Sequence, residues 1–145
     1  MNMRAQEILA QKGTDVITIT SDASLDDAIG ILAEKNIGAV LVMSDQGKID
    51  GILSERDIMR LLAGAPTGYR ETPLSEVMTK DVFTEPPSAT VDEMLALMTD
   101  KRIRHLPIVE NDRLMGFLSI GDVVKYRLEE AVGEANALKS YIAAG

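Results

Sequence analysis

Two short segments of the sequence share a pattern of residues that could hold a ligand. Residues 51–57 read GILSERD and residues 116–122 read GFLSIGD, so each has glycine, serine and aspartate three residues apart. A helix N-terminus presents free N–H groups to an anion such as phosphate, and a serine there can donate to a phosphate oxygen. An aspartate one turn into the helix can accept both hydroxyls of a ribose. The pattern therefore predicts a site for a sugar phosphate.

The same spacing also has a purely structural interpretation. Serine followed three residues later by an acidic residue is a capping box, in which each side chain satisfies a backbone N–H of the first helical turn. Ser24 with Asp27, and Thr90 with Glu93, fit this pattern and are expected to do only that. Both interpretations remain open for the two glycine-containing copies.

Basic residues distinguish the second copy from the first. Arg104 and His105 lead directly into the apolar segment LPIV at 106–109, where a charge needs a reason, and the planar guanidinium of arginine suits phosphate. A solvated basic edge before a strand is the alternative. The first copy has Gly38 and Ala39 in the corresponding place. We therefore expect tighter binding at the second copy.

Composition excludes several other kinds of site. The chain has 145 residues and no cysteine, which rules out disulfides, thiolate metal sites and cysteine catalysis, and fits a reducing compartment. Its net charge of −8 disfavours a broad nucleic-acid surface. A single histidine gives no metal-binding pair, and no catalytic triad or P-loop pattern is present. We expect no metal and no enzymatic activity.

The N-terminal sequence bears on location. No apolar run approaches the ~18 residues that a membrane span needs. The start, MNMRAQEILA, has no apolar signal-peptide core. We therefore expect a cytoplasmic protein that does not enter the membrane.

An internal repeat organises the chain. DVITI at 15–19 corresponds to DVFTE at 81–85, and SLDDAIGILAEKNI at 24–37 lies on TVDEMLALMTDKRI at 90–103 at the same offset of 66 residues. Each copy has an extended segment, an amphipathic helix, two strands joined by a turn, and a second helix. The fold class is predicted to be α+β, with β-α-β-β-α twice. Each copy is marginal as an isolated core, so we expect the two to pack with approximate two-fold symmetry and to form two clefts.

The repeat defines the expected domain boundaries. We expect an N-terminal helix within 1–14, a first repeat over 15–64, a linker over 65–80 with a helical turn at 74–77, a second repeat over 81–127, and a C-terminal helical extension over 128–145. The extension carries an apolar stripe formed by Leu128, Ala131 or Val132, Ala135, Leu138 and Ile142. Such a stripe is usually buried against a partner, which predicts a homodimer; folding back onto the same chain is the alternative.

The segments GILSERD, GFLSIGD, SEVMTKDVFT and RIRHLPIV together resemble those of tandem CBS-domain proteins, also called Bateman modules, of the small stand-alone bacterial type. The resemblance extends over roughly 15–125. It implies a regulatory module that binds an adenine nucleotide or adenosyl ligand between its repeats and signals to a separate partner protein. AMP, ADP, ATP, NAD and S-adenosylmethionine are the candidate effectors, and no cofactor is obligatory.

The resemblance also implies which residues hold the ligand. One cleft would use Ser119, Asp122 and Arg104, faced by Val16–Thr20 and Ala39, and the other Ser54, Asp57 and Arg56, with Phe83, Thr84 and His105 nearby. The expected ribose and phosphate residues are Ser119, Gly121, Asp122, Arg104, His105, Ser54, Arg56 and Asp57. The expected cleft-wall residues, near the base, are Val16, Ile17, Thr18, Thr20, Ala39, Phe83 and Thr84. A ligand-independent dimerisation module, in which the motifs are only caps, is the competing function.

Overall fold

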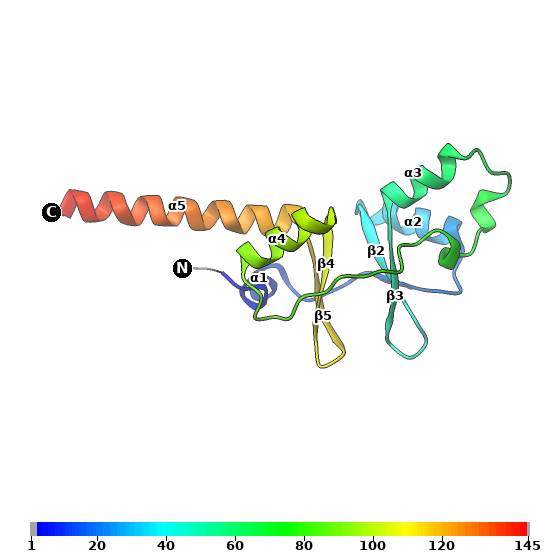
Figure 1. Ribbon diagram of the computed structural model, residues 1–145, viewed down its shortest axis with the longest axis horizontal. Coiled ribbons are helices and arrows are strands. Elements are labelled where there is room, and N and C mark those ends of the chain that lie inside the picture. The colour runs from blue at the N-terminus through cyan, green and yellow to red at the C-terminus, as the bar shows by residue number, and fades with distance from the viewer. Residues whose placement is uncertain (1–2, 145) are drawn as a thin grey trace. The chain divides into compact units, whose positions relative to one another are not determined.

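A computed structural model describes residues 3–144 of the chain, which fold as two compact units. The first-repeat unit is Val16–Val82, and the second-repeat unit combines Met1–Asp15 with Phe83–Gly145. Helices and short strands alternate in both units, as Figure 1 shows, so the predicted α+β class is confirmed. Each unit has its own core of buried apolar side chains.

The first-repeat unit has the predicted order of elements. It contains β1 (Thr18–Thr20), α2 (Leu25–Lys35), β2 (Ala39–Met43), β3 (Ile49–Ser54) and α3 (Glu55–Ala63). The sheet order is β1-β2-β3, with β1 parallel to β2 and β2 antiparallel to β3. The parallel pair is joined through α2, which is the usual way to connect parallel strands.

Local sequence explains where α2 begins and how it packs. Ser24 accepts from the N–H of Asp27, and the Asp27 carboxylate accepts from the N–H of Ser24, which completes the predicted capping box. Leu25, Ala28 and Leu32 recur at helical spacing and are buried against the sheet strands, whose Val40, Val42 and Leu53 belong to the same core.

The predicted linker over 65–80 packs onto the first repeat. It forms two short 3₁₀ helices, Tyr69–Glu71 and Leu74–Glu76, the second of which lies at the helical turn predicted over 74–77. Leu74 is fully buried in the core of this unit. Thr79 and Ile52 exchange two backbone hydrogen bonds of 2.9 Å, which fix the end of the segment beside β3.

The second-repeat unit contains α4 (Val91–Lys101), β4 (His105–Glu110), β5 (Arg113–Ser119) and α5 (Ile120–Ala144). Its sheet has only two strands, β4 and β5, which are antiparallel. The extended segment predicted at 81–85 pairs with β4 only through a parallel bridge between Glu85 and Ile108. Pro86 and Pro87 follow directly and have no N–H to donate, so the ladder stops after one residue.

The helix predicted near the N-terminus is α1 (Ala5–Lys12), and it belongs to the second-repeat unit. Residues 1 and 2 of the predicted segment lie outside the described residues. The N–H of Ala5 donates to Ala89 O at 2.8 Å, and Ala5, Ile8 and Leu9 are buried in the core of this unit. A segment that precedes the first repeat in sequence therefore completes the core of the second.

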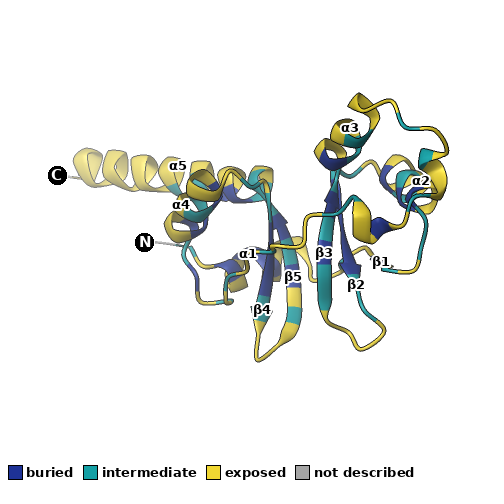
Figure 2. Cartoon of the chain, turned by 45° about the vertical axis from the view of Figure 1, so that its right-hand side comes forward, coloured by how far each residue is buried: buried dark blue, intermediate teal, exposed yellow. Residues whose placement is uncertain are grey.

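The last helix, α5, runs without interruption from the second repeat into the predicted extension. Val123 and Tyr126, in its first two turns, are buried, whereas all residues from 131 to 144 are exposed, as the colouring of Figure 2 shows. Leu128, Val132, Leu138 and Ile142 of the predicted stripe are each more than half exposed. Among residues 3–144, no helix is long and apolar enough to span a membrane.

Candidate functional site

Both copies of the motif lie where a strand ends and a helix begins. Ser54 is the last residue of β3 and the N-cap of α3, and Ser119 is the last residue of β5 and directly precedes α5. In each copy the aspartate N–H donates to the serine Oγ, at 3.3 Å for Asp57 and 3.1 Å for Asp122. In each copy the aspartate carboxylate also accepts from the serine N–H. The capping interpretation of both motifs is confirmed.

The carboxylate of the first copy is enclosed by the protein. The Asp57 side chain is 5% exposed. Its Oδ2 accepts from the Ser54 N–H and hydroxyl, both at 3.0 Å, and its Oδ1 accepts from the Thr79 hydroxyl at 3.1 Å. Arg60 lies further away, with its guanidinium 3.7 Å from Oδ1. Most of the hydrogen bonds that the Asp57 carboxylate can accept are therefore already made, and they come from uncharged donors of the same unit.

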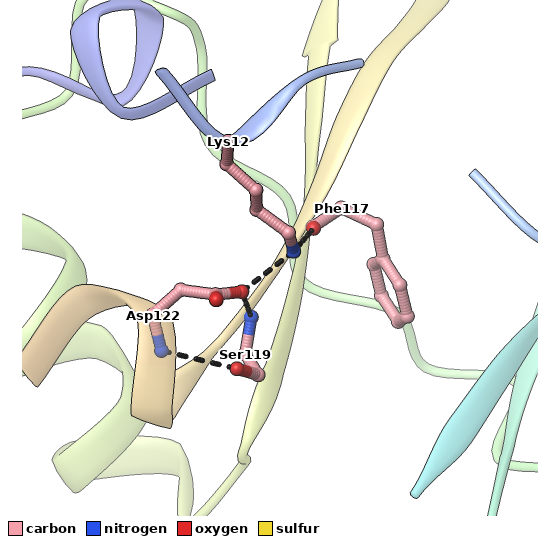
Figure 3. A network of polar contacts seen from close by, with 4 residues as sticks. All are labelled: Lys12, Phe117, Ser119 and Asp122. Carbon is pink, nitrogen blue, oxygen red and sulfur yellow. Dashed lines mark hydrogen bonds and ion pairs between the residues drawn. The ribbon is translucent and has the colours of Figure 1, made fainter. Parts of the chain in front are cut away.

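The carboxylate of the second copy has a cation as its main partner (Figure 3). The ammonium group of Lys12, at the end of α1, lies 2.6 Å from Oδ2 of Asp122 and donates to Phe117 O at 2.7 Å. Oδ2 also accepts from the Ser119 N–H at 2.9 Å. The Asp122 side chain is 25% exposed and that of Lys12 is 36% exposed, so both charged groups can be reached from solvent.

The surroundings of Asp122 favour its charged form. Partial burial pushes the pKa of Asp122 upward, but the hydrogen bond from Lys12 and the bonds from Ser119 outweigh it, and the pKa is lowered from the usual 3.8. Asp122 is therefore a carboxylate at neutral pH. An ionised carboxylate only accepts hydrogen bonds, which is the capacity that a vicinal diol requires.

The residues at the start of the first strand of each hairpin lie beside the motif serine. Ala39 is the cross-strand partner of Ser54, and the N–H of Glu55 donates to Gly38 O at 3.0 Å. In the second copy His105 is the partner of Ser119, and the N–H of Ile120 donates to Arg104 O at 2.8 Å. The correspondence between Gly38–Ala39 and Arg104–His105 is therefore confirmed.

Two basic side chains distinguish the second helix start, as the sequence indicated. Arg104 is exposed beside the first turn of α5. The ring of His105 stacks on Phe117, with ring centres 5.6 Å apart. Of the basic groups near this helix start, the Lys12 ammonium is the one in direct contact with Asp122 in the part of the chain that the structure describes.

The remaining predicted polar residues lie on the first turns of the two helices. Arg56 is exposed on α3, one residue before Asp57. Gly121 is exposed on α5, and a Cβ at this position would lie at ordinary contact distance, 3.5 Å, from Ser119 Oγ. A shallow hollow opens next to the first copy, lined by Asp57, Arg60, Leu61, Glu76 and Val77.

The predicted cleft-wall residues divide between the two units. The first-repeat unit contains Val16, Ile17, Thr18, Thr20 and Ala39, of which Ala39 is buried, Val16 is partly buried and the others are exposed. The second-repeat unit contains Phe83 and Thr84, both exposed, and the Lys101 ammonium lies 5.3 Å from the centre of the Phe83 ring. The sequence grouped each set with the motif of the other repeat, and that grouping stays a prediction.

Sequence reasoning missed the two residues that hold the aspartates from outside the motif, Lys12 and Thr79. The repeat contained a partial signal, because the 66-residue offset aligns Lys12 with Met78, next to Thr79. Sequence spacing gave no indication that Lys12 and Thr79 contact the motif aspartates. Among the described residues, no group of three His, Cys, Asp or Glu side chains could hold a metal ion.

Comparison with known proteins also finds a repeated domain in the chain. The CBS domain family model matches the chain twice, over residues 7–64 and 74–129. The CBS domain-containing protein YhcV of Bacillus subtilis is 33% identical over 124 residues, which cover 84% of this chain and 86% of YhcV. The mitochondrial CBS domain-containing protein CBSX3 of Arabidopsis thaliana is 33% identical over 130 residues; these cover 87% of this chain but only 63% of the length of CBSX3.

Solved structures resemble the chain over most of its length. The CBS-domain protein ATU1752 from Agrobacterium tumefaciens superimposes with a TM-score of 0.83 at 40% identity, covering 88% of this chain and 95% of that one. The CBS domain pair of protein MJ0100, solved with 5′-methylthioadenosine and S-adenosyl-L-methionine, has a TM-score of 0.78 at 25% identity and covers 90% of this chain and 99% of that one. With two matches of the family model and these relatives, the chain belongs to the CBS-domain family and contains two CBS domains in tandem.

Proposed function

We propose that the chain is a regulatory module that binds an adenine nucleotide or adenosyl ligand and transmits its binding to a separate protein. The observation that carries this proposal is the helix start of the second repeat. There a charged, partly exposed carboxylate at Asp122 lies beside Ser119, and the N–H of Ile120 donates to the backbone oxygen of Arg104, an exposed residue. The complex of the MJ0100 CBS pair with two adenosyl compounds supports the ligand class.

Each group has a defined role in this proposal. The Asp122 carboxylate accepts from the ribose hydroxyls, and Ser119 and the N-terminal N–H groups of α5 donate to ribose or phosphate oxygens. Arg104 and His105 add positive charge for phosphate. Ser54, Arg56 and Asp57 form a weaker site, because Asp57 is nearly buried and its acceptor capacity is largely taken by Ser54 and Thr79.

Native mass spectrometry of the purified chain, followed by thermal melts with each candidate effector, tests this function. We expect co-purified ligand, or a rise in melting temperature with at least one of AMP, ADP, ATP, NAD and S-adenosylmethionine. Asp122→Ala should abolish that rise. Asp27→Ala, which removes an aspartate from the capping box of α2, is the matched control and should keep it. A parent protein that none of these compounds stabilises would exclude the function.

The exposed stripe of α5 favours a second candidate function, dimerisation with another copy of the chain. Leu128, Ala131, Ala135, Leu138 and Ile142 follow the alternating spacing of three and four that defines a coiled-coil seam. In a parallel pair of helices, Glu134 would lie against Lys139 of the second copy on both sides of the seam. This charge complementarity favours a second α5 as the occupant of the stripe.

Sedimentation velocity tests the dimerisation candidate. A dimer that Leu138→Lys converts to a monomer would support the seam, and a dimer that persists in this variant would place the contact elsewhere. A control with Glu134 and Lys139 exchanged preserves the complementary charges and should remain dimeric. If the dimer forms and no adenylate binds, the chain is a structural dimerisation module.

A further inference from the structure

The ammonium group of Lys12 lies at the carboxylate to which the ribose is assigned above. It is 2.6 Å from Asp122 Oδ2 and 2.7 Å from Phe117 O, and these two contacts use two of its three N–H donors. The third donor is not needed for either contact, and the side chain is 36% exposed. A ligand oxygen that approaches Asp122 would therefore meet a cation with remaining donor capacity.

The first repeat has no equivalent group. The repeat offset aligns Lys12 with Met78, whose sulfur packs where a Cβ on Gly51 would lie. The adjacent Thr79 supplies a neutral hydroxyl to Asp57, and Arg60 is beyond hydrogen-bond distance of that carboxylate. The motif aspartate therefore accepts from a neutral hydroxyl outside the motif in the first repeat, and from an ammonium group in the second.

The charge at this position acts on the group at the ribose 5′ carbon. If the 2′ and 3′ hydroxyls lie on Asp122, the 5′ substituent of the same sugar is only a few bonds away, within the range that the flexible, partly exposed Lys12 side chain can sample. A 5′ phosphate would gain a charge-assisted hydrogen bond, which is about twice as strong as a neutral one. The sulfonium of S-adenosylmethionine is bonded to the same carbon and would be repelled.

On this basis, which rests on the proposed function, we propose that Lys12 determines the ligand class of the second-repeat site. It selects adenylates with a 5′ phosphate over neutral adenosine and over cationic adenosyl compounds. The chain should therefore differ in selectivity from the related CBS pair that was solved with S-adenosyl-L-methionine.

Isothermal titration of the full chain with AMP, adenosine and S-adenosylmethionine tests the selectivity. We expect the parent to bind AMP about tenfold more tightly than adenosine, as one charge-assisted hydrogen bond would give. Lys12→Met, which installs the residue of the first repeat, should weaken AMP binding about tenfold, leave adenosine within about twofold, and strengthen binding of S-adenosylmethionine. Lys12→Arg should retain the preference for AMP.

Two further variants complete the design. Lys48→Met removes the same charge from the exposed turn between β2 and β3 and should change no affinity. Lys12→Gln keeps a polar group without the charge, and it replaces Lys12→Met if that variant does not fold by circular dichroism. Either variant at position 12 should lose the preference for AMP.

The outcomes distinguish this proposal from the one on which it rests. A parent that binds none of the three compounds, nor ADP, ATP or NAD, overturns the proposed function before any variant is made. If AMP binds the parent but the variants at position 12 leave AMP affinity unchanged, Lys12 does not select the ligand. If they weaken AMP and adenosine equally, Lys12 only supports the local structure, and the proposal is likewise overturned.

Discussion

Asp57 and Asp122 occupy the same position in two copies of one motif, yet their surroundings differ. The Asp57 side chain is 5% exposed and is held by the hydroxyls of Ser54 and Thr79. The Asp122 side chain is 25% exposed and is held by an ammonium group. The pair of serine–aspartate hydrogen bonds that caps each helix is nevertheless the same. The cap is therefore common to both repeats, and the segment that packs over the cap sets the chemistry of its carboxylate.

The largest expected effect concerns the buried carboxylate. Asp57→Ala leaves the Ser54 and Thr79 hydroxyls without their acceptor and removes the carboxylate that accepts from the Ser54 N–H in the capping box of α3, so we expect a loss of about 3 kcal/mol in the free energy of unfolding. Asp122→Ala removes the corresponding carboxylate at a more exposed position and should cost about 1 kcal/mol. Urea unfolding of both variants measures the difference. Equal losses would show that the two carboxylates contribute equally to the free energy of unfolding.

The glycines of the motif differ in what packs against them. A Cβ on Gly51 would lie 2.8 Å from Thr79 O, a backbone atom, whereas a Cβ on Gly116 would meet only side-chain atoms of Leu9, the nearest at 2.4 Å. A side chain can rotate where a paired backbone cannot. We expect Gly51→Ala to destabilise the fold by about 2 kcal/mol and Gly116→Ala by about 1 kcal/mol. Thermal unfolding checks the order, which would be reversed if Leu9 cannot move.

The pair between Lys12 and Asp122 predicts a pH dependence that is specific to the second repeat. The pKa of Asp122 is lower in the folded chain than the usual 3.8, so its contribution to stability is complete above that value and is lost as pH falls through the folded pKa. Lys12→Met should cost about 1 kcal/mol at pH 7, as for a partly exposed ion pair. This difference should shrink below about pH 4 in urea titrations. If the stability difference between the parent and Lys12→Met stays constant down to pH 3, it comes from packing of the lysine side chain and not from the ion pair.

The smallest expected effect concerns Glu85, which aligns with Ile19 of β1. Partial burial, followed by repulsion from Glu93, raises the pKa of Glu85 above the usual 4.5. The charged form is thus disfavoured in the folded chain, and any stabilisation by the protonated form is lost as pH rises through the folded pKa. Glu85→Gln should therefore stabilise the chain by about 0.5 kcal/mol at pH 7 and have no effect near pH 4. Destabilisation at pH 7 would point to a favourable interaction of the carboxylate.

Much of the fold could be predicted because its signals are local. The capping box that begins α2, the apolar strand AVLVM and the repeat offset are all visible in sequence windows of a few residues to one repeat. At the start of α4 the expected capping box is formed only in part, because Thr90 accepts from the N–H of Glu93 without the reciprocal bond. That the first extended segment of the second repeat pairs over a single residue could also have been predicted, because Pro86 and Pro87 follow it in the sequence. The helical periodicity past Asp122 likewise predicted the extension of α5.

The partners of the motif aspartates could not be predicted in the same way. Lys12 is 110 residues from Asp122, and Thr79 is 22 residues from Asp57. No local periodicity connects residues so far apart, and a lysine at a helix C-terminus is already explained by the helix dipole. Only tertiary packing of α1 shows that this lysine serves the second repeat.

The placement of α1 has a consequence for how the chain is made. All residues of the unit Val16–Val82 are contiguous, so this unit can fold as soon as Val82 has been synthesised. The other unit needs Ala5, Ile8 and Leu9, which precede that unit in the sequence, and a β-hairpin and helix that follow it. The core residues of this second unit lie on both sides of the unit Val16–Val82, so they can meet only after that unit has been made. Folding of Val16–Val82 brings its two ends closer and shortens the effective loop between them. The helix α1 is thus made before the unit Val16–Val82 but can be buried only after the hairpin that follows that unit, and in the interval a chaperone would meet exposed Ile8 and Leu9.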